Sequence, residues 1–264
     1  MLRMNDGRDI PALGYGTYQI PDAQAGIIVR RAIDAGYALV DTAAIYGNER
    51  GVGDAVKGED VFVTTKLWND RHGDAAAALD ESLALLGLDA VDLYLIHWPV
   101  PEAGGFVDAW NALIDLRAAG KARSIGVSNF LPEHIEAIVE ATGVTPAVNQ
   151  IELHPHFQQR EARAFHAEHG IVTQSWSPLG QGDLLADPAI VAIAERHHAS
   201  AAQVVLAWHL AHDLSAIPKA ADEAHMRDNR RATDVALEAH DIEAIDALDR
   251  EDGRIGPNPR TFGM

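Results

Sequence analysis

Short apolar runs alternate with longer stretches of helical periodicity along the whole chain. Between the apolar runs, segments such as 23–36, 74–87 and 132–143 carry apolar residues with i, i+3, i+4 spacing. Eight runs have the length and composition of strands, and they lie at residues 13–17, 37–41, 61–66, 91–97, 122–128, 147–152, 171–176 and 214–219. This alternation predicts βα units around a parallel sheet, and the eight strands predict a (β/α)8 TIM barrel.

Local signals predict the ends of several elements. Asp74 can cap the helix predicted at 74–87, and Pro132 stands in the first turn of the next predicted helix. The first eleven residues contain an NDG turn and predict a hairpin that closes the bottom of the barrel. Further helices are predicted near 223–232 and 241–250, and the Gly/Pro-rich tail 251–264 is predicted to be a surface loop.

An open doubly wound sheet is the alternative architecture. It is disfavoured because no G-x-G-x-x-G motif follows the first predicted strand, which continues instead into TYQIPDAQ at 17–24. Barrels of this class commonly reach about 250 residues as one domain. Since no repeat or linker divides the chain, residues 1–264 are predicted to form a single domain.

Composition and charge narrow the function. The net charge of −18 disfavours a nucleic-acid partner, because phosphate binding needs clustered Lys and Arg. No uncharged apolar run of about 18 residues could span a membrane, so we expect a soluble, cytoplasmic protein without a membrane partner. The absence of cysteine excludes a disulfide framework, a thiolate metal site and a cysteine nucleophile.

Polar residues stand at the C-terminal ends of the predicted strands, where the side chains of a barrel converge on one mouth. Each alone has a structural explanation, such as a satisfied core histidine or a surface lysine. Together they would desolvate many polar groups for no structural gain, so a ligand site explains them better. They are Asp41, Lys66, His97, Ser128, Asn129, Asn149, Gln150, Trp176, Ser177 and Lys219.

Tyr46 follows Asp41 by five residues, and if it meets Asp41, Lys66 and His97, the four suggest a general acid. A nearby ammonium stabilises a phenolate, so Lys66 could lower the pKa of Tyr46, while Asp41 keeps Lys66 charged and oriented. A neutral His97 could hold a substrate carbonyl oxygen beside the phenol. This constellation predicts protonation of a carbonyl.

A protonated carbonyl needs an attacking group, and hydride from a nicotinamide cofactor would meet that need. Ser128, Asn129 and Gln150 offer hydrogen bonds for a carboxamide, and Trp176 offers a flat face for stacking. The loop SPLGQGD at 177–183 offers backbone donors for a pyrophosphate, and Lys219 offers a cation for a further phosphate.

The chain resembles the aldo-keto reductases, in particular the bacterial group that includes 2,5-diketo-D-gluconic acid reductases. The resemblance extends over essentially the whole chain. Its motifs are LGYGTYQ (13–19), DTAAIYGNE (41–49), TTKLW (64–68), LYLIHWP (93–99), IGVSNF (125–130), NQIELHP (149–155), SWSPLGQG (175–182) and IPKA (217–220).

The resemblance implies roles for individual residues. It makes Tyr46 the general acid, tuned by Lys66 and Asp41, and makes His97 the group that orients the carbonyl. The substrate pocket is expected to be lined by Tyr18, Tyr46, Trp68, His97 and Trp98. The residues expected to contact the cofactor are Gly16, Thr17, Asp41, Ser128, Asn129, Gln150, Trp176, Ser177, Leu179, Gly180, Gln181, Lys219, Ala220, His225 and Asn229.

The end of the site that would hold the adenosine 2′-phosphate departs from the family pattern. Ala220 replaces the usual serine and His225 the usual arginine, whereas Lys219 and Asn229 remain. A neutral imidazole is a poor substitute for a bidentate guanidinium. The sequence therefore predicts NADPH as cofactor with weakened discrimination and measurable use of NADH, unless Arg227 or Arg230 compensates.

Three other functions are alternatives to the reductase. A metal site at His154, His156, His197 and His198 is disfavoured, because adjacent helical histidines point apart. A Schiff-base aldolase would require a neutral Lys66, which Asp41 opposes. A nucleotide-sensing module would bind the cofactor without turnover.

Trp110 and Trp208 are predicted to pack in the outer ring of helices. The expected substrates are small aldehydes, dicarbonyls such as methylglyoxal, α-keto esters or keto-sugars, and the expected state is a monomer.

Overall fold

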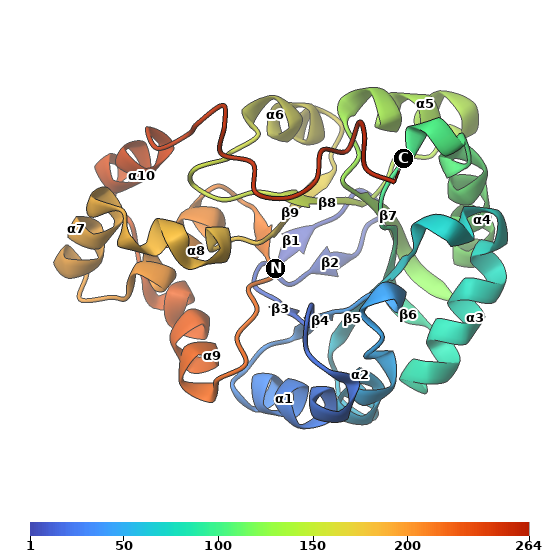
Figure 1. Ribbon diagram of the computed structural model, residues 1–264, viewed down its shortest axis with the longest axis horizontal. Helices are drawn as coiled ribbons and strands as arrows, with labels where there is room; N and C mark the ends of the chain where they lie inside the picture. The colour runs from blue at the N-terminus through green and yellow to red at the C-terminus, as the bar shows by residue number, and fades with distance from the viewer. Residues whose placement is uncertain (264) are drawn as a thin grey trace.

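Eight parallel strands form the centre of the molecule. The computed structural model describes residues 1–263, and its main sheet has the strand order β10-β9-β8-β7-β6-β5-β4-β3. A parallel bridge between Leu13 and Ala216 joins the two outermost strands, so the sheet closes on itself and the predicted (β/α)8 barrel is confirmed (Figure 1). The strands are β3 (Tyr15–Gly16), β4 (Leu39–Asp41), β5 (Phe62–Leu67), β6 (Val91–Ile96), β7 (Ala122–Ser128), β8 (Val148–Glu152), β9 (Val172–Trp176) and β10 (Ser215–Ala216).

The first and last strands of the barrel, β3 and β10, are shorter than the sequence predicts. The amides of Gly14 and Gly16 still donate across the seam, to the carbonyls of Ala216 and Pro218. Pro218 has no N–H to return, so the regular ladder cannot continue through it. The seam is therefore held by a few backbone bonds between short segments.

Helices surround the sheet. They are α1 (Asp22–Asp34), α2 (Glu49–Val56), α3 (Ala75–Leu86), α4 (Phe106–Ala118), α5 (Pro132–Thr142), α6 (Arg160–Glu168), α7 (Pro188–Arg196), α8 (Ala201–Ala211), α9 (Glu223–Arg230) and α10 (Ala239–Asp246). The helices predicted at 23–36, 74–87 and 132–143 are α1, α3 and α5, within two residues at each end. Pro132 opens α5 as predicted. Asp74 precedes α3, but its carboxylate accepts from Arg71 instead of a helix amide, so the predicted cap bond is not formed.

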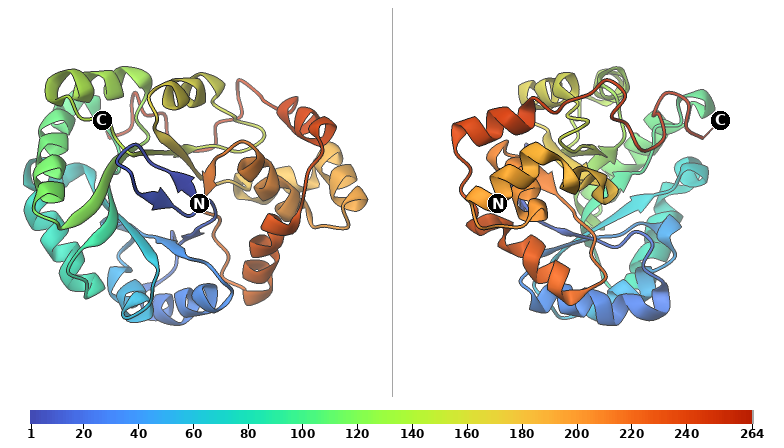
Figure 2. Two further views of the ribbon diagram at one scale, coloured as in Figure 1. Left: turned by 180° about the vertical axis from the view of Figure 1, so that it is seen from behind. Right: turned by 60° about the vertical axis from the view of Figure 1, so that its left-hand side comes forward.

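The N-terminal hairpin lies across one end of the barrel, as predicted. Strands β1 (Leu2–Arg3) and β2 (Asp9–Ile10) pair antiparallel, and the view from behind shows them across the barrel opening (Figure 2). Met4 and Ile10 are buried with the inward-facing Leu39, Leu93 and Leu95. The hairpin therefore closes the bottom of the apolar interior.

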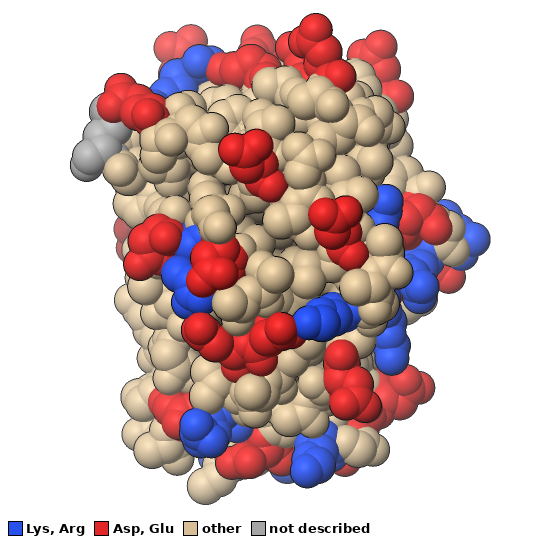
Figure 3. Space-filling model, turned by 90° about the vertical axis from the view of Figure 1, so that its right-hand side faces the viewer, with Lys and Arg blue, Asp and Glu red and all other residues tan. Residues whose placement is uncertain are grey.

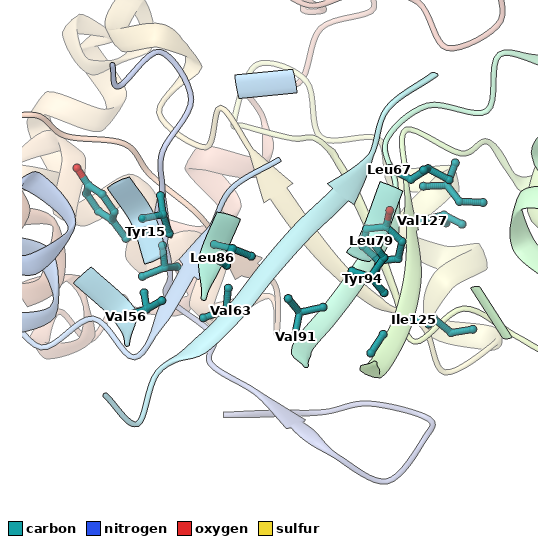
Figure 4. Close-up of a cluster of buried hydrophobic side chains, with 14 of the residues drawn as sticks. Tyr15, Val56, Val63, Leu67, Leu79, Leu86, Val91, Tyr94, Ile125 and Val127 are labelled. Atoms are coloured by element: carbon teal, nitrogen blue, oxygen red, sulfur yellow. The ribbon is translucent and has the colours of Figure 1, made fainter. Parts of the chain in front are cut away.

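A second apolar layer fills the space between the sheet and the helices. Side chains alternate between the two faces of a strand, so Val63 and Tyr94 point outward and pack near Leu79 and Leu86 (Figure 4). Trp110 and Trp208 are fully buried in this outer layer, which confirms their predicted packing role. The barrel interior is thereby left to the residues of the opposite parity.

The surface carries the acidic excess. Acidic side chains are spread over the face seen in Figure 3, and basic side chains stand beside many of them. Exposed ion pairs such as Lys121–Asp80 and Arg71–Glu81 contribute little to stability, because water and salt screen both charges. No helix within residues 1–263 is both long enough and apolar enough to cross a membrane.

A buried histidine, His166 on α6, links that helix to strands β8 and β9. The side-chain amide of Asn149 donates to the Phe130 carbonyl (2.8 Å) and to Nε2 of His166 (2.9 Å), while Nδ1 of His166 lies 2.9 Å from Thr173 Oγ1. Because an NH2 group faces Nε2, that nitrogen accepts and the ring is neutral. Burial, with a smaller contribution from the charge of His169, lowers the pKa of His166 to about 4.

This histidine makes folding sensitive to acid. Below about pH 6.5 the histidine is protonated in the unfolded chain, whereas in the folded chain it stays neutral down to about pH 4. The free energy of unfolding therefore falls by roughly 3 kcal/mol as the pH drops over that range. Replacing His166 with Gln should make the free energy of unfolding fall less steeply between these pH values. Urea unfolding across a pH series measures this slope. His198→Asn, at an exposed position of positive φ that asparagine tolerates, is the control; an equal slope in all three proteins would contradict the prediction.

Candidate active site

The alternation of side chains along the strands brings three charged or titratable groups to the barrel interior. Residue Asp41 follows Leu39 by two positions, and His97 follows Leu95 by two, so both continue the inward-facing rows. Lys66 pairs in register with Leu95 and faces the same interior. All three stand at the C-terminal ends of β4, β5 and β6, which is where the sequence predicts them.

The centre of the site is a buried ion pair. Lys66 Nζ lies 2.6 Å from Asp41 Oδ1, and the side chains are 0% and 2% exposed. Lys66 also donates to the Thr42 carbonyl (2.9 Å), and the second Asp41 oxygen accepts from Gln150 Nε2 (2.8 Å). Because each charge has a second partner, the pair is compensated in a place that would otherwise disfavour both ions.

Tyr46 lies on the loop that follows β4. A short 3-10 turn, Ala44–Tyr46, and a left-handed Gly47 (φ 65°) return the loop to the mouth. The phenol oxygen lies 3.4 Å from Lys66 Nζ. The Tyr46 ring also lies 5.7 Å from the His97 ring, measured between centroids. The structure therefore brings Asp41, Tyr46, Lys66 and His97 together, as the sequence predicts.

The loop is held in place by Asn48, which sequence reasoning did not single out. Its fully buried side chain donates to the carbonyls of Thr17 (2.9 Å) and Ile20 (3.0 Å) and accepts from Thr42 Oγ1 (2.7 Å). These bonds connect both ends of the Tyr46 loop to the segment after β3. The only sequence signal was its place two residues after Tyr46 in the motif DTAAIYGNE.

Aromatic rings surround the tetrad. Tyr18 lies 5.1 Å from Tyr46, and Trp68 lies 5.1 Å from His97, measured between ring centroids. Trp98 is buried and packs on Phe262 at 4.4 Å. Of the residues expected to line the substrate pocket besides Tyr46 and His97, Tyr18 and Trp68 therefore lie against the tetrad, and Trp98 lies against the Phe262 ring.

Burial dominates the electrostatics. It raises the pKa of Tyr46 well above 10.0, helped by the charges of Asp41 and Tyr18, which is opposite to the predicted lowering because desolvation outweighs the ammonium. Burial also lowers the pKa of His97 well below 6.5, helped by Lys66, so His97 is neutral as predicted. Burial raises the pKa of Asp41 and lowers that of Lys66, and their ion pair opposes both shifts. Tyr46 thus keeps its proton near neutral pH.

The predicted carboxamide ligands bond with one another beside the tetrad. Ser128 Oγ donates to the Gln150 carbonyl, Asn129 Nδ2 donates to the carbonyl of His97 and to Ser128 Oγ, and Gln150 Nε2 bridges Asp41 and Gln174. Trp176 Nε1 donates to Asn129 Oδ1 (2.8 Å), which fixes its partly exposed indole.

This set of groups fits a nicotinamide. The amides of Asn129 and Gln150 and the hydroxyl of Ser128 can give up hydrogen bonds to one another and form hydrogen bonds to a carboxamide instead. The indole of Trp176 offers a face for stacking. Asn129 and Ser177 have positive φ values of 62° and 49°, so the chain turns sharply where strands β7 and β9 end. Non-glycine residues in this region store strain that recurs at functional sites. Thr17, also expected at this end, donates through both its amide and Oγ1 to the Asp41 carbonyl.

The predicted phosphate-binding residues lie on the turn after β9 and around α9. Leu179 and Gly180 are partly or fully buried and Gln181 is exposed. Lys219 and His225 are exposed, whereas Asn229 is buried and the Ala220 carbonyl accepts from the Tyr15 hydroxyl. The exposed Lys219 is the cation of this group.

The two arginines considered as compensating partners at the phosphate end, Arg227 and Arg230, both bond to other groups of the protein. Arg227 forms an ion pair with Glu223 one turn earlier on α9 (2.8 Å). Arg230 donates to the Gly36 carbonyl and to Thr233 Oγ1.

The C-terminal tail is irregular and mostly exposed, so the predicted surface loop is confirmed. It also passes over the mouth, with Phe262 packed on Trp98 and 6.3 Å from the Trp68 ring (Figure 1). The Gly/Pro-rich composition gave no sign of this, because the contact depends on a single aromatic residue near the chain end. Met264 of the predicted tail lies outside the described residues.

Three of the four histidines considered as metal ligands have other partners. His154 lies 3.3 Å from Glu152, His156 3.1 Å from Asp187 and His197 2.7 Å from Asp241. Among residues 1–263, no three His, Asp or Glu side chains are arranged to hold a metal ion.

Comparison with known proteins identifies relatives over the full chain. The model of the Aldo/keto reductase family matches residues 12–250. An aldo-keto reductase of Mycolicibacterium smegmatis is 48% identical over 270 residues, covering 100% of this chain and 98% of that protein. The methylglyoxal reductase DkgA of Escherichia coli is 42% identical, with the same coverage. The crystal structure of a Gox0644 mutant in complex with NADPH has a TM-score of 0.98 and 45% identity, covering 100% of this chain and 98% of that one.

The role of Asn48 can be tested by stability. Asn48→Ala removes three buried hydrogen bonds, to the carbonyls of Thr17 and Ile20 and from the Thr42 hydroxyl, so we expect a loss of about 2–4 kcal/mol in the free energy of unfolding. Urea unfolding measures the change. Asn111→Ala is the matched control, because the exposed Asn111 bonds only to a carbonyl of its own helix. A loss for Asn48→Ala below about 0.5 kcal/mol, the range of ordinary surface substitutions, would contradict the assignment.

Proposed function

The chain belongs to the aldo/keto reductase family, and from this premise we propose that it reduces small carbonyl compounds with NADPH. We further propose that its substrates are dicarbonyls such as methylglyoxal, with α-keto esters and keto-sugars as related candidates, and that Tyr46 is the proton donor. The observation that carries the proposal is the buried Asp41–Lys66 pair, whose ammonium lies 3.4 Å from the Tyr46 hydroxyl. It is the group needed to stabilise a phenolate when the proton leaves.

Methylglyoxal is favoured as a substrate for two reasons. The relatives of Yersinia pestis and Escherichia coli named methylglyoxal reductase DkgA are 43% and 42% identical over the whole chain. The mouth is also narrowed by aromatic rings, namely Tyr18 beside Tyr46 and Trp68 beside His97. A small dicarbonyl fits between such rings more readily than a bulky ketone does.

The residues divide the work of proton transfer. Tyr46 keeps its proton near neutral pH because burial raises its pKa, and it can give that proton to a carbonyl oxygen. Lys66, held by Asp41 and the Thr42 carbonyl, stabilises the phenolate as it forms. His97 is neutral and can donate a hydrogen bond that fixes the carbonyl oxygen. NADPH, when bound, supplies the hydride for the carbonyl carbon.

The cofactor site is proposed to use the strand-end groups. Ser128, Asn129 and Gln150 would hold the carboxamide of the nicotinamide, and Trp176 would stack on its ring, as the resemblance to the family implies. Asp41 links the two halves of the site, because one carboxylate oxygen pairs with Lys66 and the other accepts from Gln150. The cofactor end and the proton donor are thereby fixed relative to each other.

The two alternative functions have less support. A Schiff-base aldolase would need an unpaired, neutral Lys66, whereas this lysine is held by Asp41 at 2.6 Å. A binding module would not need the tetrad, whose four side chains converge within hydrogen-bond or ring contact.

The function is tested by NADPH oxidation with methylglyoxal, an α-keto ester and a keto-sugar. We expect turnover by the wild type. In Tyr46→Phe we expect kcat to fall by at least about 100-fold, because a positioned general acid contributes roughly 10²–10⁴-fold. NADPH binding, followed by fluorescence titration, should be unchanged in the variant. A variant that keeps more than about a tenth of kcat, a loss below about 1.4 kcal/mol, would remove Tyr46 from the role.

Cofactor choice is the second test. Because Ala220 and His225 stand where the family has a serine and an arginine, we expect kcat/KM to favour NADPH over NADH by far less than several thousandfold. His225→Arg restores a charge-assisted partner and should raise this ratio by about tenfold or more. Arg227→Gln is the matched control, since Arg227 is already paired with Glu223 on the same helix. A wild-type ratio of several thousandfold would contradict the prediction.

A further inference from the structure

One buried carboxylate, that of Glu152, binds the main chain of the C-terminal tail to the barrel. The backbone amides of Ile255 and Gly256 donate to the two oxygens of Glu152, at 2.5 Å and 2.9 Å. Glu152 ends strand β8, two residues beyond Gln150, and is 1% exposed. A loop is thus bound through its main chain to a residue on the rigid sheet.

Glu152 is ionised in this position. Burial alone would raise its pKa, but the bonds from His154 and from the amides of Ile255 and Gly256 bring the pKa below its usual 4.5. Hydrogen bonds to an ionised acceptor are roughly twice as strong as neutral ones. The two tail amides therefore provide much of the compensation that a buried carboxylate requires.

The anchored segment leads directly to the site. Gly256 packs against the Trp176 ring so closely that a Cβ there would lie 2.4 Å from Trp176 Cη2 and 2.9 Å from Glu152 Oε2. Six residues later Phe262 packs on Trp98 at 4.4 Å, and Gly263 lies against Val100. The tail therefore runs from Trp176, at the proposed nicotinamide end of the mouth, to Trp98, at its proposed substrate end. The right-hand view of Figure 2 shows this red segment crossing the molecule to the C-terminus.

We propose that Glu152 is a positioning residue that fixes the tail so that Phe262 forms one wall of the substrate pocket. The inference rests on the proposed function, because it names the pocket as the place where the carbonyl substrate binds. Without the anchor, the seven residues from 257 to 263 would have to hold Phe262 in place by side-chain contacts alone. The entropy of ordering a free segment opposes that arrangement.

The test is a comparison of substrate and cofactor binding. Glu152→Gln keeps the size of the side chain but replaces one charged acceptor with a donor that faces a backbone amide. We expect the KM for methylglyoxal to rise by about tenfold, the loss of one buried ring contact, with kcat and the Kd for NADPH within about threefold. An unchanged KM would overturn the proposal.

A second variant attacks the same anchor from the tail. Gly256→Ala changes a tail residue and keeps Glu152: its Cβ would meet Trp176 and Glu152, so the tail is pushed away from both and KM should rise even where Glu152→Gln does not fold. Arg260→Gln is the matched control, because it breaks only the exposed pair with Glu133 and should leave KM unchanged. A rise in KM for Arg260→Gln equal to that for Gly256→Ala would overturn the role of the anchor.

A double-mutant cycle shows whether Glu152 acts through Phe262. Phe262→Ala alone should raise KM as Glu152→Gln does, and the double variant should add little to either. Effects that multiply fully would mean that Glu152 acts by another route, and the proposal would fail.

Limited trypsin digestion distinguishes this inference from the proposed function, because the rate of cleavage in the tail depends on how firmly the tail is attached and not on carbonyl reduction. Cleavage after Arg254 or Arg260 should be faster in Glu152→Gln than in the wild type. Unchanged cleavage in an enzyme that reduces methylglyoxal overturns the anchor alone. Faster cleavage in a protein that reduces none of the carbonyls supports the anchor and overturns the function.

Discussion

The buried ion pair between Asp41 and Lys66 is the interaction on which the site depends. Two charges in a barrel interior are costly, and they are tolerated here because Thr42 and Gln150 supply further hydrogen bonds. A buried pair of this kind is weak evidence for stability. Its value lies in chemistry, since it keeps an ammonium within reach of a phenol whose own burial would otherwise leave the phenolate unsupported.

The parity of the strands decides which groups can take part in this site. Leu39 and Leu95 point inward, and the same parity turns Asp41 and His97 into the interior, while Val40 and Ile96 pack under the helices. A shift by one residue in either strand would exchange these sets. The apolar layers below the mouth therefore do more than stabilise the barrel: they set the register that brings the polar groups together.

The mouth is built from strand ends and completed by loops. The strands contribute the Asp41–Lys66 ion pair and the hydrogen-bonded side-chain amides near Gln150, and the sheet fixes the positions of both. The loops contribute Tyr46, held by Asn48, and Phe262, reached through the tail that Glu152 binds. Polar anchors to the main chain thus give two irregular segments the precision that the sheet gives its own residues.

The sequence by itself determined the barrel, the inward residues at the strand ends and the approach of Tyr46 to them, because these follow from periodicity and from the shared direction of parallel strands. The resemblance to a family placed the remaining residues in order along the mouth. Only the tertiary structure decided the direction of the Tyr46 pKa shift, since desolvation depends on every neighbour of the ring. It also decided that Asn48 and Glu152 bind loops and that Phe262 reaches Trp98, because side-chain contacts between separate segments of the chain leave no periodic trace in the sequence.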